Sequence, residues 1–121
     1  MNTQQAFNFI IAHLRKQKDR AVSKTGACVY TTPEGTSCAV GCLIQDIKLS
    51  DKQNTCASAE LIRENPEVQS RLEDIDTRFL ANMQTLHDRQ SYYGKKGFTS
   101  RGEREIKRIA NLFDLSLPEQ S

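Results

Sequence analysis

Residues 26–42, GACVYTTPEGTSCAVGC, hold three of the chain's four cysteines around a Thr-Pro-Glu-Gly turn. The run Val-Tyr-Thr-Thr before the proline is rich in residues that favour strands. Pro33 suits the second position of a type I turn, and Gly35 can take the positive φ that closes it. The segment therefore predicts a β-hairpin over 28–39, followed by a short helix or a buried turn over 41–47.

A lone hairpin is barely stable in water, so this one must pack against helices. Helical periodicity precedes it over 3–18, where one face carries only apolar side chains. These are Ala6, Phe7, Ile10, Ile11 and Leu14. Asn2 or Thr3 can cap the first turn of this helix.

Further helices are predicted after the hairpin, over 57–64 and 66–74, separated by an Asn-Pro pair that stops the first of them. Another helix begins near 76–77, with an apolar face formed by Phe79, Leu80, Met83, Leu86 and His87. A glycine-containing loop over 90–98 leads to the last helix. Ser100 and Glu103 match a capping box at its start, and its apolar stripe is Ile106, Ile109, Ala110 and Phe113.

Together these elements predict an α+β fold, mainly α, with helices packed around one β-hairpin. The length of 121 residues suits a single domain over 1–121, with 116–121 as a frayed tail. Hydrophobic residues make up 37% and charged residues 26%, the balance of a soluble globular protein. Because there is no apolar run for a membrane span and no signal-peptide pattern, we expect a cytoplasmic protein without a membrane partner.

The cysteines have three interpretations. In the reducing cytosol they stay thiols or bind metal. Cys38 and Cys42 form one closely spaced pair, and Cys28 with Cys56 could complete a zinc site, as could His13 or His87. Zinc folds usually offer two such pairs and the second is missing here, so no cofactor is expected and zinc is the alternative.

Nucleophilic catalysis is the second interpretation. Cys38 precedes a predicted helix start, where backbone N–H groups can stabilise a thiolate, and His87 with Asp88 could supply a base. No nucleophile-elbow motif marks the site. The third interpretation, in which the thiols pack as small apolar side chains, fits the small residues around them best. The chain is therefore expected not to be an enzyme.

Basic residues gather at two places although the net charge is only +2. One cluster follows the first helix, and the other accompanies the sequence YYGKKGF and the last helix. We predict that the second cluster is a binding surface made of Tyr92, Tyr93, Lys95, Lys96, Arg101, Arg104, Lys107 and Arg108. A protein is the expected partner, and the basic clusters could meet an acidic surface on it or simply be solvated. Nucleic acid is the alternative, because aromatic side chains can stack on bases while lysines meet phosphates.

The segment from Cys28 to Ile44, with its Cys-aromatic start and its CAVGCLI end, resembles a family of small uncharacterised phage, prophage and bacterial proteins. The later stretch MQTLHD at 83–88 is similar to a signature of the same family. The resemblance covers about residues 5–90 and implies an accessory protein that binds and modulates a host protein in the bacterial cytoplasm. An inhibitor of a host enzyme or of a defence system would fit this context.

Overall fold

The computed structural model is mainly helical and contains one antiparallel pair of strands. It describes residues 1–17, 29–33, 35–55, 58–94 and 96–118. The elements follow in the order α1 (Thr3–Gln17), the 3₁₀ turns η1 (Gly41–Leu43) and η2 (Gln53–Thr55), α2 (Ser58–Glu64), α3 (Pro66–Leu72), α4 (Thr77–Asp88), β1 (Tyr93–Gly94), β2 (Gly97–Phe98) and α5 (Ser100–Leu112). The predicted class, α+β and mainly α, is confirmed.

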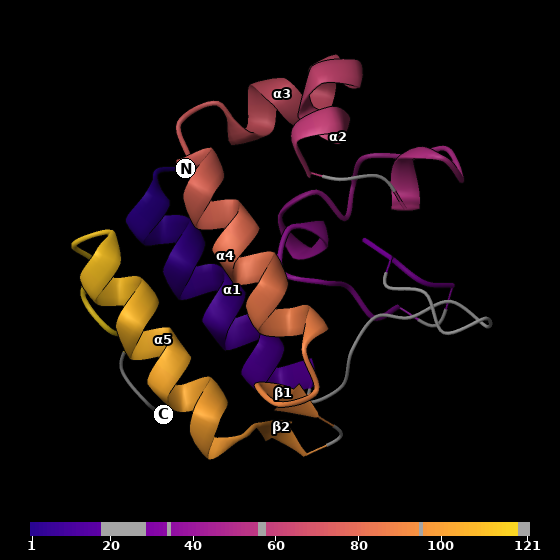
Figure 1. Ribbon diagram of the computed structural model, residues 1–121. Helices are drawn as coiled ribbons and strands as arrows, with labels where there is room; N and C mark the ends of the chain where they lie inside the picture. The colour runs from indigo at the N-terminus through magenta and orange to yellow at the C-terminus, as the bar shows by residue number, and fades with distance from the viewer. Residues whose placement is uncertain (18–28, 34, 56–57, 95, 119–121) are drawn as a thin grey trace.

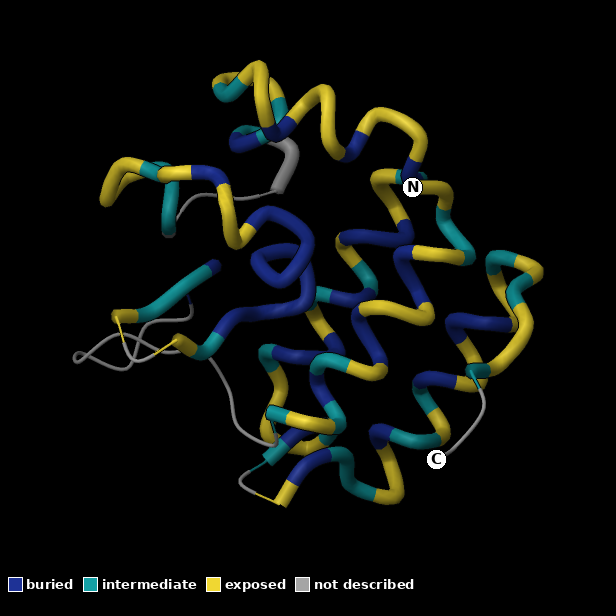
Figure 2. Tube along the Cα trace, turned by 180° about the vertical axis from the view of Figure 1, so that it is seen from behind, coloured by how far each residue is buried: buried dark blue, intermediate teal, exposed yellow. Residues whose placement is uncertain are grey.

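Helices α1, α4 and α5 pack together as the body of the protein (Figure 1). The strand pair lies at one end of this body, and α2 and α3 lie at the other. Buried residues line the inward faces of the helices and the turn at η1 (Figure 2). The ring of Phe79 on α4 joins the layers, because it meets Phe7 of α1 and Phe113 beyond α5 edge-on, at centroid distances of 6.1 and 5.7 Å.

The helical periodicity predicted most of this packing. All five residues of the apolar face predicted for the first helix are buried on α1. The five predicted residues of the fourth helix, including His87, are buried on α4. Asn2 caps α1 by accepting from the N–H of Gln5 at 2.9 Å, as predicted. None of the helices within the described ranges is long and apolar enough to cross a membrane.

The break between α2 and α3 also follows the sequence. The side chain of Asn65 accepts from the N–H groups of Glu67 and Val68 at 3.1 and 3.2 Å, and Pro66 opens α3. Asp76 caps α4 in the same way, accepting from Arg78 at 2.8 Å. These side chains satisfy N–H groups in the first turns of α3 and α4, so residues adjacent in the sequence set where both helices begin.

The predicted capping box at the start of α5 is wrong. Thr99 is the N-cap, and its hydroxyl accepts from the N–H of Gly102 at 3.0 Å. Glu103 instead lies beside Arg15 of α1, with a Nη2–Oε2 distance of 3.1 Å. The Glu103 carboxylate therefore pairs with a side chain of another helix and does not form the cap that the sequence motif predicted.

The predicted hairpin over 28–39 is only partly formed. Its turn is present, since the N–H of Gly35 donates to the carbonyl of Thr32 at 3.0 Å and Gly35 has a φ of 91°. The pairing is limited to one bridge between Thr31 and Ser37, and Cys28 lies outside the described residues. Side chains of α1 and η2 take over the other hydrogen bonds: Gln17 binds the backbone of Ser37, and Asn54 binds that of Thr31.

The regular strands lie instead inside the segment predicted as a loop. Tyr93 pairs with Phe98, and Gly94 pairs with Gly97. The pair contacts α1, α4 and α5. Tyr93 anchors it, because its side chain is fully buried and its hydroxyl donates to the carbonyl of Leu14 at 2.6 Å.

After α5 the chain reverses and runs back along the helix (Figure 1). Asp114 takes the left-handed conformation, with a φ of 54°, and the N–H of Leu115 donates to the carbonyl of Ala110 at 2.7 Å. This is a Schellman ending. Ser116 then exchanges two hydrogen bonds with Gln4, at 2.8 and 3.0 Å. Residues 119–121 lie outside the described part, and the frayed tail over 116–121 stays a prediction.

Candidate functional site

The outer face of α5 is basic. Arg101, Arg104, Lys107 and Arg108 are all exposed on it, at spacings that place them on one side of the helix. The opposite side is buried against the body. The structure therefore brings together the four α5 residues that were predicted to bind a partner.

The acidic residues of α5 do not neutralise this face evenly. Glu103 pairs with Arg15, as described above. Glu105 accepts from Nε of Arg108 at 2.7 Å, and the same guanidinium donates to Asn82 of α4 at 3.0 Å. Within the described ranges, no acidic side chain pairs with Arg101, Arg104 or Lys107, so these three cations are free to meet an external anion.

The other four predicted contact residues differ in how far they are exposed. Lys96 is exposed beside the strand pair, and Tyr92 is partly buried. Tyr93 is fully buried, with its ring tilted against that of Phe98 at a centroid distance of 5.0 Å, so it is not part of the surface. Lys95 lies outside the described residues. The aromatic side chains on which the nucleic-acid interpretation depended therefore serve mainly the core.

A hollow of about 560 Å³ lies between α5 and the returning chain. One wall carries the cations of α5, and the other carries aliphatic side chains of the tail, including Leu117, which is 50% exposed. It is lined by Arg104, Lys107, Arg108, Ala110, Asn111, Asp114, Leu115 and Leu117. Sequence reasoning missed this hollow, because it depends on the reversal at Asp114.

The two described cysteines lie in the core. Cys38 accepts from the N–H of Gly41 at 3.2 Å, and the thiol of Cys42 donates to the carbonyl of Ala39 at 3.1 Å. Burial raises the pKa of the Cys38 thiol to about 12 and also raises the pKa of Cys42. Both therefore stay protonated at neutral pH, and a buried protonated thiol is a poor nucleophile.

The residues considered for catalysis meet around Gln84. Its amide donates to Asp88 at 3.0 Å and accepts from the N–H of Val40 at 3.3 Å, beside the Cys38 thiol. Nδ1 of His87 lies 2.7 Å from the same Asp88 oxygen, and the His87 ring is fully buried. This arrangement satisfies polar groups inside the core and fastens the η1 turn to α4.

The metal interpretation rests in part on residues that the structure does not describe. Cys28 and Cys56 lie outside the described ranges. Among the residues inside them, no group of three or more His, Cys, Asp or Glu side chains is placed to hold a metal ion. His13 is half-buried with Nε2 3.2 Å from the carbonyl of Ser37, and burial lowers its pKa.

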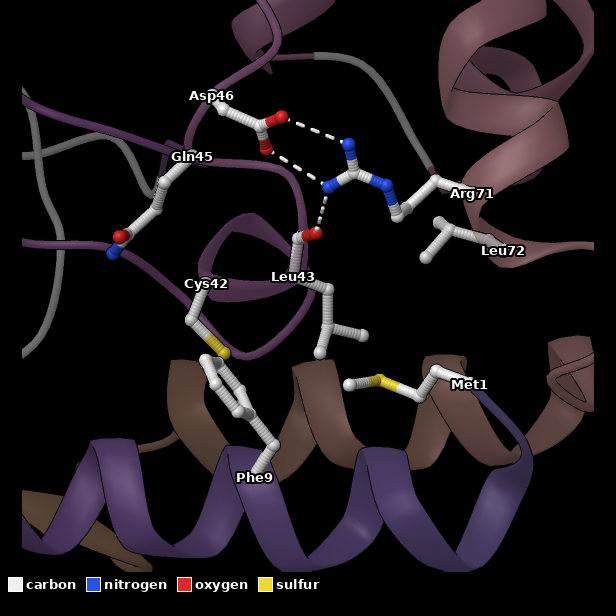
Figure 3. A pocket seen from close by; sticks show the side chains of 8 residues that line it. All are labelled: Met1, Phe9, Cys42, Leu43, Gln45, Asp46, Arg71 and Leu72. Atoms are coloured by element: carbon white, nitrogen blue, oxygen red, sulfur yellow. Dashed lines mark hydrogen bonds and ion pairs between the residues drawn. The ribbon is translucent and has the colours of Figure 1, made fainter.

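A second, apolar hollow of about 350 Å³ lies on another side of the protein (Figure 3). Phe9 and Met1 extend into it from the α1 end, while Cys42 and Leu43 face them from η1. Arg71 closes the rim: its two terminal nitrogens each bind one oxygen of Asp46 at 2.8 Å, which lowers the pKa of Asp46 to about 2. In the sequence, the signal for this hollow is Phe9, an aromatic residue of α1 that lies outside the helix's apolar stripe.

In comparisons with protein families, with curated proteins and with solved structures, nothing matches this chain. The resemblance to phage and prophage proteins stays a prediction. The assignment of function therefore depends on the surfaces described above.

The burial of the thiols gives a direct prediction. When the native protein is treated with iodoacetamide near neutral pH, Cys38 and Cys42 are expected to remain unmodified, because neither is exposed or ionised. Both are expected to react after unfolding in guanidinium chloride. Peptide mass spectrometry distinguishes the two sites, and selective modification of native Cys38 would favour the cysteine-enzyme alternative instead.

Proposed function

We propose that this chain is a non-enzymatic protein-binding module that uses the basic outer face of α5 to cover an acidic surface of a partner protein. The observation that carries the proposal is the set of three cations, Arg101, Arg104 and Lys107, that share this face without an acidic partner in the described chain. Free cations on a rigid helix favour association with an anionic surface and speed the encounter.

The resemblance to small phage and prophage proteins suggests the setting. In that setting the partner is a host protein in the bacterial cytoplasm, and binding modulates it by occluding a functional surface. The buried thiols and the buried His87 support a role without catalysis, because they are committed to packing and internal hydrogen bonds.

A protein partner is favoured over nucleic acid by the surroundings of the cations. Base stacking needs exposed aromatic rings next to the phosphate-binding charges. Here Tyr93 is buried, while the exposed neighbours of the basic face are aliphatic: Leu112 is 59% and Leu117 50% exposed. Arginine is enriched at protein–protein interfaces, and the buried centre of such an interface is apolar.

Charge reversal tests the proposal. The variant with Arg101→Glu, Arg104→Glu and Lys107→Glu is expected to bind the partner at least about 10-fold more weakly than the wild type, since each change replaces an attraction by a repulsion. The matched control reverses Lys16, Lys48 and Arg63, which are exposed elsewhere, and alters the net charge equally.

The partner is first identified as a protein that the immobilised wild type retains from a bacterial lysate and that an unrelated immobilised protein does not. Affinities are then measured with the purified partner by biolayer interferometry, and circular dichroism checks that each variant is folded. Equal loss by the two variants, or no loss by the α5 variant, would contradict the assignment of the surface.

A further inference from the structure

The hollow between α5 and the returning chain has two chemically different walls. Arg104 and Lys107 supply unpaired positive charge on the helix side. Leu115 and Leu117 supply apolar surface on the tail side. We infer that this hollow binds an acidic side chain together with an adjacent aliphatic side chain of the partner protein, an inference that rests on the proposed function of the α5 face.

The charges place the acidic group at one end of the hollow. Arg108 is already neutralised by Glu105, with Nε 2.7 Å from its carboxylate. Asp114 adds a negative charge where the chain turns, beyond the end of α5. An incoming carboxylate is therefore attracted to Arg104 and Lys107, earlier in the helix, and repelled from the turn, which orients the bound segment.

The apolar wall is held in place before any partner binds. Ser116, between the two leucines, donates to Gln4 at 2.8 Å and accepts from it at 3.0 Å. The N–H of Leu115 donates to the carbonyl of Ala110 at 2.7 Å. A wall fixed by these bonds loses little conformational freedom on binding, which favours affinity.

The walls of the hollow fit a side-chain pair better than a nucleotide. At about 560 Å³ the hollow lies within the range of ligand-binding clefts. None of the side chains that line it is aromatic, so a base would find no ring on which to stack. An acidic segment with interspersed leucines satisfies both walls at once.

Two synthetic peptides test the inference in an NMR titration of the labelled protein. One alternates glutamate and leucine, and the other has serine in place of each leucine. The wild type is expected to bind the leucine peptide about 10-fold more tightly, because one leucine side chain is buried. Leu117→Ser is expected to abolish this preference. Phe9→Ser, which alters an exposed apolar side chain on α1 away from the hollow, is expected to keep it.

The outcomes separate the two proposals. If the wild type binds both peptides equally and the α5 charge-reversal variant loses both, the α5 face stands and the hollow is wrong. If the charge reversal leaves peptide binding unchanged, both proposals fail. A mixed-sequence DNA oligonucleotide that binds more tightly than either peptide, and is lost on charge reversal, would overturn both in favour of nucleic acid.

Discussion

Replacing Gly41 by alanine is expected to lower the free energy of unfolding by about 3 kcal/mol or more. A Cβ atom at position 41 would lie 1.9 Å from the carbonyl oxygen of Tyr30. That oxygen cannot move freely, because it accepts from the N–H of Cys38 at 3.1 Å. Alanine therefore forces the 29–39 segment away from η1 and breaks the packing between them.

Gly94→Ala is the matched control for this change. A Cβ at Gly94 meets nothing within 4 Å, and its backbone is outside the left-handed region. The control is expected to change the unfolding free energy by no more than about 0.5 kcal/mol. Urea denaturation followed by circular dichroism measures both variants. A Gly41→Ala protein as stable as the control would show that the contact with Tyr30 is not formed.

Gly102→Ala is expected to destabilise the protein by about 2 to 3 kcal/mol, although alanine is the better helix former. Helix propensity alone predicts a gain of about 1 kcal/mol at this position in α5. The added Cβ, however, would lie 2.0 Å from the carbonyl oxygen of Tyr92. That carbonyl accepts from the N–H of Thr99 at 2.9 Å, so relieving the clash disturbs the α5 cap and the strand pair together.

Helix propensity and the clash with Tyr92 predict opposite changes in stability for Gly102→Ala, so the direction of the measured change decides between them. A rise in thermal stability would mean that α5 does not pack against the Tyr92 backbone as described. A fall of roughly 6 to 12 °C in Tm is expected for a domain of this size. The same variant is expected to weaken partner binding, because α5 carries the proposed contact surface.

The helices of this fold were predictable because each is encoded locally. Their apolar stripes repeat with helical periodicity, and Asn65 and Asp76 cap them with their own side chains. The strand pair was not predictable in the same way, since strands of two residues are too short to show an alternating pattern. The true cap at Thr99 was missed because Glu103 is drawn to Arg15, far away in sequence.

The candidate site was predictable only as a set of charges. The spacing of Arg101, Arg104 and Arg108 on one helix placed them on one face. Burial of Tyr93 could not be read from its sequence neighbours, because it depends on packing of the strand pair against α1, α4 and α5, where its hydroxyl donates to the carbonyl of Leu14. The hollow beside α5 depends on the backbone reversal at Asp114, a residue that adopts the left-handed region less readily than glycine.

The most direct test of the proposed binding face is amine labelling of the complex with its captured partner. Lys107 lies on the outer face of α5, while Lys16 and Lys48 are exposed elsewhere. We expect acetylation of Lys107 to slow at least several-fold when the partner binds and Lys16 and Lys48 to react as in the free protein. Unchanged labelling of Lys107 together with protection of Lys16 or Lys48 would contradict this expectation, and the contact would then lie away from α5.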